Sequence, residues 1–146
     1  MAERTVFQSM IKRHVVRVFP QANVWEAACL MTAENVGSVL VVETTGALLG
    51  IVTERDLMTR VLAKARDPKA TKVADVMTKG PLCVPPETPV PDAVVTMIEK
   101  GFRHLPVVGP GNKILGVFSV RDALPREIGS ALSISEFNEQ LNDVSL

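Results

Sequence analysis

The chain contains two copies of one pattern, and this internal repeat limits its fold more than any other feature. Shifting the sequence by 66 positions aligns residues 5–62 with residues 71–128 without a gap, and 13 of the 58 pairs are identical. The best-preserved stretch, residues 49–56, falls on residues 115–122. Two tandem copies of a supersecondary unit suggest one module with a pseudo-twofold axis, whose interface could hold a ligand in duplicate.

Composition narrows the class of protein. The 146 residues are 47% hydrophobic and 22% charged, as in ordinary globular domains, and the formal net charge is zero, which gives no electrostatic footprint for nucleic-acid binding. No apolar run approaches the roughly 20 residues that span a bilayer, and the N-terminus has no signal-like apolar stretch. Cys29 and Cys83 lie within apolar patterns and are predicted to be buried free thiols. We therefore expect a cytoplasmic protein with neither a nucleic-acid nor a membrane partner.

Each repeat is predicted to form a strand, a helix, two strands and a closing helix. In the first copy these elements cover residues 14–19, a helix capped by Asn23 with Glu26 completing a capping box, then 38–42, 48–52 and 54–63. In the second copy they cover 82–84, a helix from Thr88-Pro89, then 104–108, 114–119 and a helix from Arg121 onward. Short helices are predicted over 7–11 and 73–77.

The organisation along the chain follows from the repeat. Residues 5–63 form repeat 1, residues 64–80 a linker with a short helix that leads into repeat 2, and residues 71–128 repeat 2. Residues 129–146 form a C-terminal tail, where Ser133 and Glu136 are predicted to cap a short amphipathic helix that docks on the module or on a second chain.

A hydroxyl and a carboxylate stand at each junction between the last strand and the closing helix. Thr53 and Asp56 follow Gly50, and Ser119 and Asp122 follow Gly116 at the same spacing. A hydroxyl at a strand end can cap the next helix, and a carboxylate at its mouth can bind both hydroxyls of a ribose-type diol. The preceding Arg55 and Arg121 could reach a phosphate. The alternative is that both pairs are helix caps only, but the matched second copy favours ligand binding.

These motifs, which read GxxTxRD and GxxSxRD, together with the 66-residue period, resemble a tandem pair of cystathionine-β-synthase (CBS) domains, also called a Bateman module. The resemblance covers residues 5 to about 128, and we expect a stand-alone pair without a catalytic domain. It implies an α/β (α+β) fold in which two β-α-β-β-α repeats pack sheet to sheet. It also implies two clefts for adenosine-containing ligands, with AMP the first candidate and ATP, ADP, NAD or S-adenosylmethionine as others.

The resemblance also implies which residues line the clefts. Asp56 and Asp122 would hold the ribose hydroxyls, beside Thr53 and Ser119. Each cleft would be built across the repeats: the Ser119/Asp122 cleft would add His14, Val16, Gly37 and Ser38, and the Thr53/Asp56 cleft would add Gly80, Leu82, Phe102 and Arg103. Basic residues in the family lie near the phosphates, where this chain has Arg103 and His104.

The two repeats differ at their inner strands. Leu40 of the first corresponds to Pro106 of the second, and Gly37-Ser38 corresponds to Arg103-His104, so only the second inner strand carries cations. We therefore expect the two sites to be unequal.

No catalytic constellation is apparent, because the chain has two His, no Tyr, no phosphate-binding loop and no zinc-type spacing. We expect a regulatory protein and not an enzyme. One hypothesis is an adenosine-nucleotide sensor that signals to a downstream protein through the geometry of a homodimer, in which Trp25 could lie at the subunit interface. The other is a ligand-independent dimerisation and interaction module with vestigial clefts.

Overall fold

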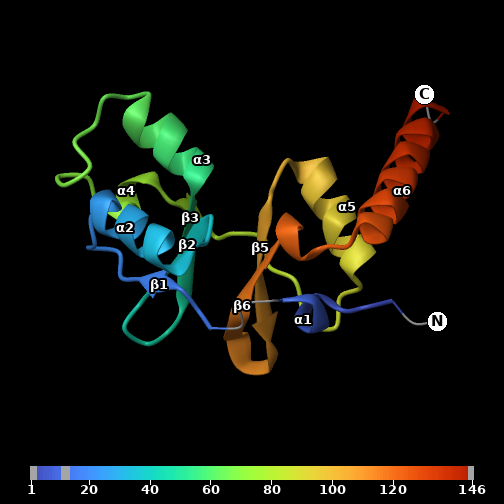
Figure 1. Ribbon diagram of the computed structural model, residues 1–146, viewed down its shortest axis with the longest axis horizontal. Helices are drawn as coiled ribbons and strands as arrows, with labels where there is room; N and C mark the ends of the chain where they lie inside the picture. The colour runs from blue at the N-terminus through green and yellow to red at the C-terminus, as the bar shows by residue number, and fades with distance from the viewer. Residues whose placement is uncertain (1–2, 11–13, 145–146) are drawn as a thin grey trace. The chain divides into compact units, whose positions relative to one another are not determined.

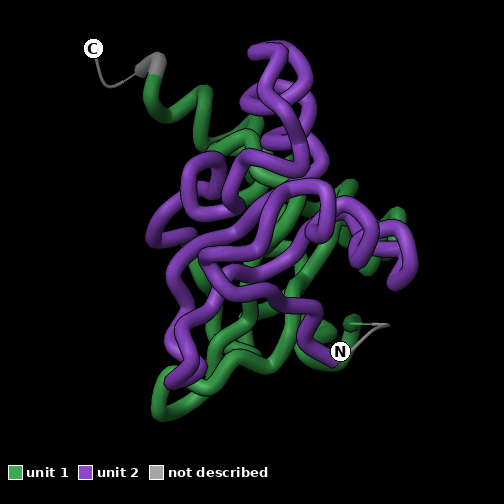
Figure 2. Tube along the Cα trace, turned by 90° about the vertical axis from the view of Figure 1, so that its left-hand side faces the viewer, with its two compact units in different colours: residues 1–13, 82–146 green, residues 14–81 purple. Residues whose placement is uncertain are grey.

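The computed structural model describes residues 3–10 and 14–144 (Figure 1). The chain forms two compact units, coloured separately in Figure 2. Unit 2 comprises residues 14–81 and holds the first repeat from residue 14 onward, together with the segment that leads into the second repeat. Unit 1 comprises residues 1–13 and 82–146 and holds the second repeat from residue 82 onward, together with the N-terminal segment. The mixed α/β fold with two repeats is confirmed. Within the described chain, no helix combines the length and the apolar character needed to cross a bilayer.

Unit 2 is built on a four-stranded sheet in the order β1-β2-β3-β4. The strands are β1 (Arg17–Val18), β2 (Ser38–Val42), β3 (Leu48–Thr53) and β4 (Thr78–Lys79), with β1 parallel to β2 and the other pairs antiparallel. All five residues of β2 are buried, as its apolar run predicted. Helix α2 (Val24–Glu34) adds Val24, Ala27 and Met31 to the core.

Helix α2 begins and ends for local reasons. The Asn23 side chain accepts a hydrogen bond from the Glu26 amide at 2.8 Å, which confirms the predicted cap. The predicted capping box is not completed, because the Glu26 carboxylate contacts the Asn23 side-chain amide at 3.5 Å and not the Asn23 backbone amide. Asn35 ends the helix in the left-handed conformation, with φ of 53°, a conformation that asparagine tolerates better than most residues.

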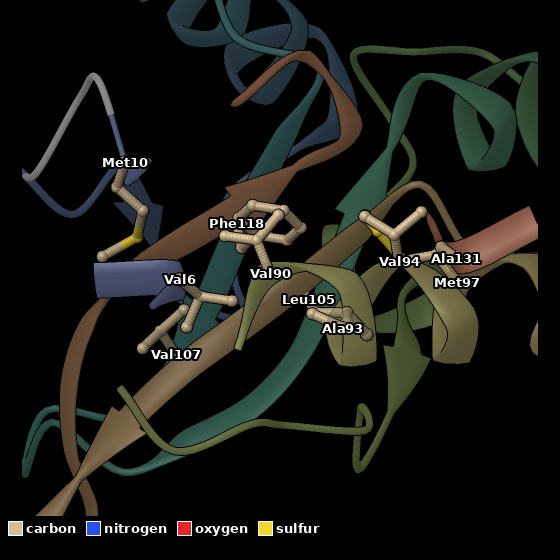
Figure 3. Close-up of a cluster of buried hydrophobic side chains, with 10 residues drawn as sticks. All are labelled: Val6, Met10, Val90, Ala93, Val94, Met97, Leu105, Val107, Phe118 and Ala131. Atoms are coloured by element: carbon tan, nitrogen blue, oxygen red, sulfur yellow. The ribbon is translucent and has the colours of Figure 1, made fainter. Parts of the chain in front are cut away.

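Unit 1 contains the antiparallel pair β5 (His104–Gly109) and β6 (Lys113–Ser119), joined by the short 3-10 turn η2 (Pro110–Asn112). Helix α5 (Val90–Lys100) packs with this pair around a core that includes Phe118 and Leu105 (Figure 3). The predicted strand over 82–84 is reduced to one parallel bridge between Val84 and Val107. Prolines at 81, 85 and 86 flank it, and proline has no N–H to donate to a strand ladder.

The short helix at the start of each repeat packs in the unit that holds the rest of the other repeat. In unit 1, α1 (Val6–Ser9) contacts α5 and β6, and the Val6 amide donates to the Thr88 carbonyl at 2.8 Å. In unit 2, α4 (Val73–Val76) contacts β3 and the preceding π-helical turn η1 (Leu57–Leu62), and the Val73 amide donates to the Ala22 carbonyl at 2.8 Å. The two repeats therefore exchange equivalent leading helices.

The leading helices correct the gap-free alignment. Helices α2 and α5 begin 66 residues apart, at Val24 and Val90, but α1 and α4 begin 67 apart, at Val6 and Val73. The first repeat thus has one more residue between its leading helix and its main helix. The prediction of short helices over 7–11 and 73–77 was right in kind, and for the first of them out of register by one residue.

The C-terminal tail differs from its prediction. Helix α6 runs without a break from Pro125 to Val144, so Ser133 lies inside it and its hydroxyl donates to the Gly129 carbonyl at 3.2 Å. The expected cap at Ser133 is therefore wrong. The helix starts instead at Pro125, which is suited to a first helical position, and the Glu127 carboxylate accepts from the Leu124 amide at 2.8 Å.

The cysteines also correct a prediction. Neither forms a disulfide, but Cys29 is exposed and Cys83 is half-buried. On α2 the buried residues are Val24, Ala27 and Met31, and Cys29 lies two positions from Ala27 and Met31, which turns it away from that face. Burial raises the pKa of the Cys83 thiol.

Candidate functional site

The segments 53–56 and 119–122, called here the Asp56 loop and the Asp122 loop, have nearly the same local geometry. After β3, the Asp56 Oδ2 atom accepts hydrogen bonds from the Thr53 amide at 2.9 Å and from the Thr53 hydroxyl at 3.2 Å. After β6, the Asp122 Oδ2 atom accepts from the Ser119 amide at 2.9 Å. Each hydroxyl in turn accepts from a backbone amide, that of Asp56 or of Arg121, at 3.3 Å. Both pairs are therefore helix caps, and each cap fixes its carboxylate beside a strand end.

Strand pairing places the start of the inner strand beside the loop of the same repeat. In unit 2, Ser38 pairs with Thr53, and the Glu54 amide donates to the Gly37 carbonyl at 3.0 Å. In unit 1, His104 pairs with Ser119, and the Val120 amide donates to the Arg103 carbonyl at 3.2 Å. The structure thus brings these predicted residues together within each unit. The clefts built across the repeats stay a prediction.

Asp56 is held by a cation that the sequence analysis did not single out. The Arg60 Nε atom lies 3.6 Å from Asp56 Oδ1, one helical turn further along the chain. The Arg60 Nη1 atom donates to the carbonyls of Val76 and Met77, each at 3.1 Å. Arg60 therefore ties the carboxylate to the segment that enters β4. A signal was present in the sequence, because Arg60 and Arg126 are an identical pair in the repeat.

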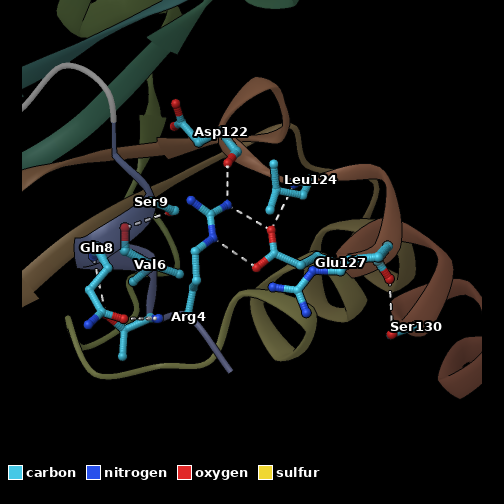
Figure 4. Close-up of polar contacts among 10 residues, drawn as sticks. Arg4, Val6, Gln8, Ser9, Asp122, Leu124, Glu127 and Ser130 are labelled. Carbon is cyan, nitrogen blue, oxygen red and sulfur yellow. Dashed lines mark hydrogen bonds and ion pairs between the residues drawn. The ribbon is translucent and has the colours of Figure 1, made fainter. Parts of the chain in front are cut away.

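A second arginine approaches the other loop from the N-terminus (Figure 4). The Arg4 Nη2 atom donates to the Asp122 backbone carbonyl at 3.1 Å and to Glu127 Oε1 at 2.8 Å, and its Nε atom donates to Glu127 Oε2 at 3.2 Å. The Glu127 side chain is 0% exposed. The Arg4 hydrogen bond lowers the pKa of Glu127, against the opposing effect of burial, and the same bond raises the pKa of Arg4. Neither residue was predicted, because nothing in the sequence pairs positions so far apart.

The glycine of the motif has a packing role. A Cβ atom on Gly50 would lie 2.6 Å from the Met77 sulfur and 2.7 Å from the Thr78 carbonyl oxygen, closer than real side chains approach. Gly50 is paired with Lys79, so the close neighbour is the edge strand β4. In unit 2 this glycine is therefore needed for β4 to pack against β3.

The other predicted residues lie at varied positions. Gly80 has φ of 53° and its amide donates to the Leu49 carbonyl at 3.1 Å, four residues along β3 from Thr53. His14 is exposed and its Nε2 atom lies 2.8 Å from Glu34 Oε2. The Val16 carbonyl accepts from Leu40, and the Pro106 carbonyl accepts from Val84. The side chains left exposed are those of Arg55, Leu82, Phe102, Arg103 and Arg121.

The groups in these loops can bind a ligand that carries hydroxyl groups. Each loop offers carboxylate and hydroxyl acceptors fixed by backbone amides, a set that recognises hydroxyl groups. Among the described residues, no group of three or more His, Cys, Asp or Glu side chains is placed to hold a metal ion.

Comparison with known proteins gives a consistent family. The family model described as CBS domain matches twice, over residues 7–63 and 73–127. An uncharacterized protein of Methanopyrus kandleri is 31% identical over 134 residues, which cover 89% of this chain and 68% of that protein. The eukaryotic relatives are much longer, and this chain spans only 16% to 26% of their lengths.

Solved structures show the same architecture. A putative signal-transduction protein with CBS domains from Burkholderia ambifaria is 33% identical, with a TM-score of 0.74 over 80% of this chain and 86% of that one. A CBS domain protein from Pyrobaculum aerophilum, solved in complex with AMP, is 23% identical, with a TM-score of 0.77 over 89% of this chain and 98% of that one. At that identity the second likeness concerns the fold alone.

Proposed function

The chain belongs to the CBS domain family, and from this premise we propose that it is a regulatory module that binds an adenosine nucleotide. The observation that carries the proposal is the repeated loop, in which Asp56 and Asp122 are each fixed by an amide at the end of a strand. A carboxylate held in this way can accept hydrogen bonds from the two hydroxyls of a ribose. AMP is the first candidate, since a related fold carries it in the Pyrobaculum protein.

The remaining predicted residues have roles in the same proposal. Arg103, which the family likeness assigns to the Thr53/Asp56 cleft, supplies positive charge for a phosphate group, with His104 beside it. On the first repeat, Gly37 and Ser38 occupy the equivalent places and carry no charge. Arg121 offers a cation from the Ser119/Asp122 loop. His14, Val16, Gly80, Leu82, Phe102 and Pro106 complete the two clefts in the proposal.

The module acts in regulation and not in catalysis under this proposal. Ligand binding shifts the geometry of a homodimer, which a partner protein in the cytoplasm detects. The exposed Trp25, with the Lys69 ammonium 4.8 Å from its ring centroid, is a candidate for the dimer surface. The net charge of zero supports a small-molecule or protein partner over a nucleic acid.

The same two helix caps also support a second candidate function. Because both hydroxyl–carboxylate pairs already serve helix capping, the repeats would keep them even without a ligand. The alternative is therefore a dimerisation and interaction module that binds no nucleotide.

Thermal unfolding in the presence of AMP, ADP, ATP, NAD or S-adenosylmethionine separates the two functions. A ligand present at about one hundred times its Kd raises Tm by roughly 5–10 °C for a chain of this size. We expect such a rise with one of the five. Asp56→Ala and Asp122→Ala variants that keep the wild-type circular dichroism spectrum show which loop binds, because the rise should shrink only when the aspartate of the binding loop is replaced. No rise with any ligand would favour the interaction module. Sedimentation with and without the ligand tests the dimer.

A further inference from the structure

The same short pattern leads to different structures in the two repeats. Arg55-Asp56 is followed by Arg60, and Arg121-Asp122 by Arg126, at identical spacing. After Asp56 the helix continues from α3 (Glu54–Asp56) directly into the π-helical turn η1 (Leu57–Leu62). After Asp122 the chain leaves the 3-10 turn η3 (Val120–Asp122), because Ala123 is extended with ψ of 143°.

Proline explains this divergence. Pro125 stands where the first repeat has Thr59. A proline at this point of a continuing helix would lack the amide needed for the helical hydrogen bond, and it disfavours helical geometry for the residue before it. The helix therefore stops at Asp122 and restarts at Pro125 as α6.

In the first repeat the continued helix brings Arg60 to the carboxylate. Both hydrogen bonds from Thr53 go to Asp56 Oδ2, and Arg60 Nε lies 3.6 Å from Oδ1. The Asp56 side chain is only 10% exposed. The guanidinium is itself fixed by the carbonyls of Val76 and Met77. A diol that used this carboxylate would have to displace an anchored cation.

In the second repeat the break leaves the carboxylate without such a cation. Asp122 Oδ2 accepts from the Ser119 amide, and in the described part of unit 1 no cation lies within ion-pair distance of either oxygen. Arg126 is exposed in the first turn of α6. Arg4 attracts Asp122 electrostatically, but its hydrogen bonds go to the Asp122 carbonyl and to Glu127. Asp122 Oδ1 is therefore free to accept a ligand hydroxyl.

We propose that the two loops differ in ligand binding. One nucleotide per chain binds through its ribose hydroxyls at Asp122, while the contact of Arg60 with Asp56 prevents a second nucleotide from binding at the Asp56 loop. This inference rests on the proposed nucleotide-binding function and specifies which loop performs it.

Isothermal titration of the full chain with AMP tests the inference. We expect one site per chain in the wild type. Asp122→Asn removes a charged acceptor and should weaken binding roughly tenfold to hundredfold. Arg60→Gln should add a second binding event at the freed Asp56. Arg126→Gln, which changes the equivalent arginine of the second repeat, is the matched control and should leave the single site unchanged.

Several results would overturn the inference while leaving nucleotide binding intact. These are two equal sites in the wild type, a single site whose affinity survives Asp122→Asn, or a folded Arg60→Gln variant that still takes one AMP. The Asp122→Asn result stands even if Arg60→Gln proves unstable through loss of its bonds to Val76 and Met77. Absence of binding by AMP and by every other adenosine ligand would instead contradict the proposed function itself.

Discussion

Arg4 and Glu127 lie at opposite ends of the sequence, yet their side chains meet through two hydrogen bonds, at 2.8 and 3.2 Å. The contact joins the segment before α1 to the first turn of α6 (Figure 4). Because the Glu127 side chain is fully buried and also caps the Leu124 amide, its charge depends on Arg4 for compensation. This pair therefore fastens the N-terminal segment to unit 1.

Removing Arg4 should destabilise the protein strongly. Arg4→Ala leaves a buried carboxylate without its cation, and we expect a loss of about 3 kcal/mol in the free energy of unfolding. Urea denaturation followed by circular dichroism measures this loss. Arg126→Ala, which removes an exposed arginine next to Glu127 in sequence, should change the same quantity by about 0.5 kcal/mol or less. Equal losses in the two variants would contradict the assigned role of the pair.

The same pair should make stability depend on pH. The pKa of Glu127 is lowered in the folded state, so its contribution is fully present above the unfolded value of about 4.3 and is lost as the pH falls through the folded value. Glu127→Gln keeps the shape of the side chain but does not titrate. We therefore expect the difference in unfolding free energy between wild type and variant to shrink from about pH 6 to pH 3. A constant difference across that range would mean that Glu127 has the same pKa in the folded and unfolded states, which contradicts the lowering by Arg4.

Local patterns in the sequence were sufficient to predict most elements and the candidate loops. The caps at Asn23 and Thr53 and the buried strand β2 depend on neighbouring residues only, and the structure contains all three. The family and the two-repeat α/β fold also followed, because the repeat carries specific motifs twice.

The structural features that the sequence did not predict depend on contacts between distant residues or on the helix break before Pro125. The exchange of α1 and α4 between the repeats joins segments far apart in the chain, and no periodicity encodes it. Arg60 and Arg126 stand at the same spacing from Asp56 and Asp122, so the sequence suggested no difference between the loops. Pro125 could have indicated one, because a proline generally interrupts a continuing helix. The length of α6 was not predicted, because Ser133 followed by Glu136 is typical of a helix cap and the pattern alone does not indicate that a helix has already begun at Pro125.

The two cysteines should react at different rates. Cys29 is exposed on α2, whereas burial raises the pKa of the half-buried Cys83 thiol. Since the thiolate is the reactive form, iodoacetamide at pH 8 should label Cys29 first. Peptide mass spectrometry over time separates the two sites, and Cys29→Ser should remove the fast phase. In urea both thiols should react at similar rates, and equal rates already in the native protein would contradict the burial of Cys83.

Two glycine substitutions should change stability in opposite directions. In Gly50→Ala the new Cβ would meet the Met77 sulfur at 2.6 Å and the Thr78 carbonyl oxygen at 2.7 Å. The side chain of Met77 can move, but the carbonyl belongs to the backbone of β4, so we expect a loss of about 1–3 kcal/mol in unfolding free energy. Gly129→Ala is the matched control, because Gly129 lies within α6 and a Cβ there would meet nothing within 4 Å. Alanine is the better helix former by about 1 kcal/mol, so this variant should gain stability. If Gly50→Ala were as stable as wild type, β4 could not be packed as closely on β3 as the structure has it, and the glycine of the motif would need another explanation.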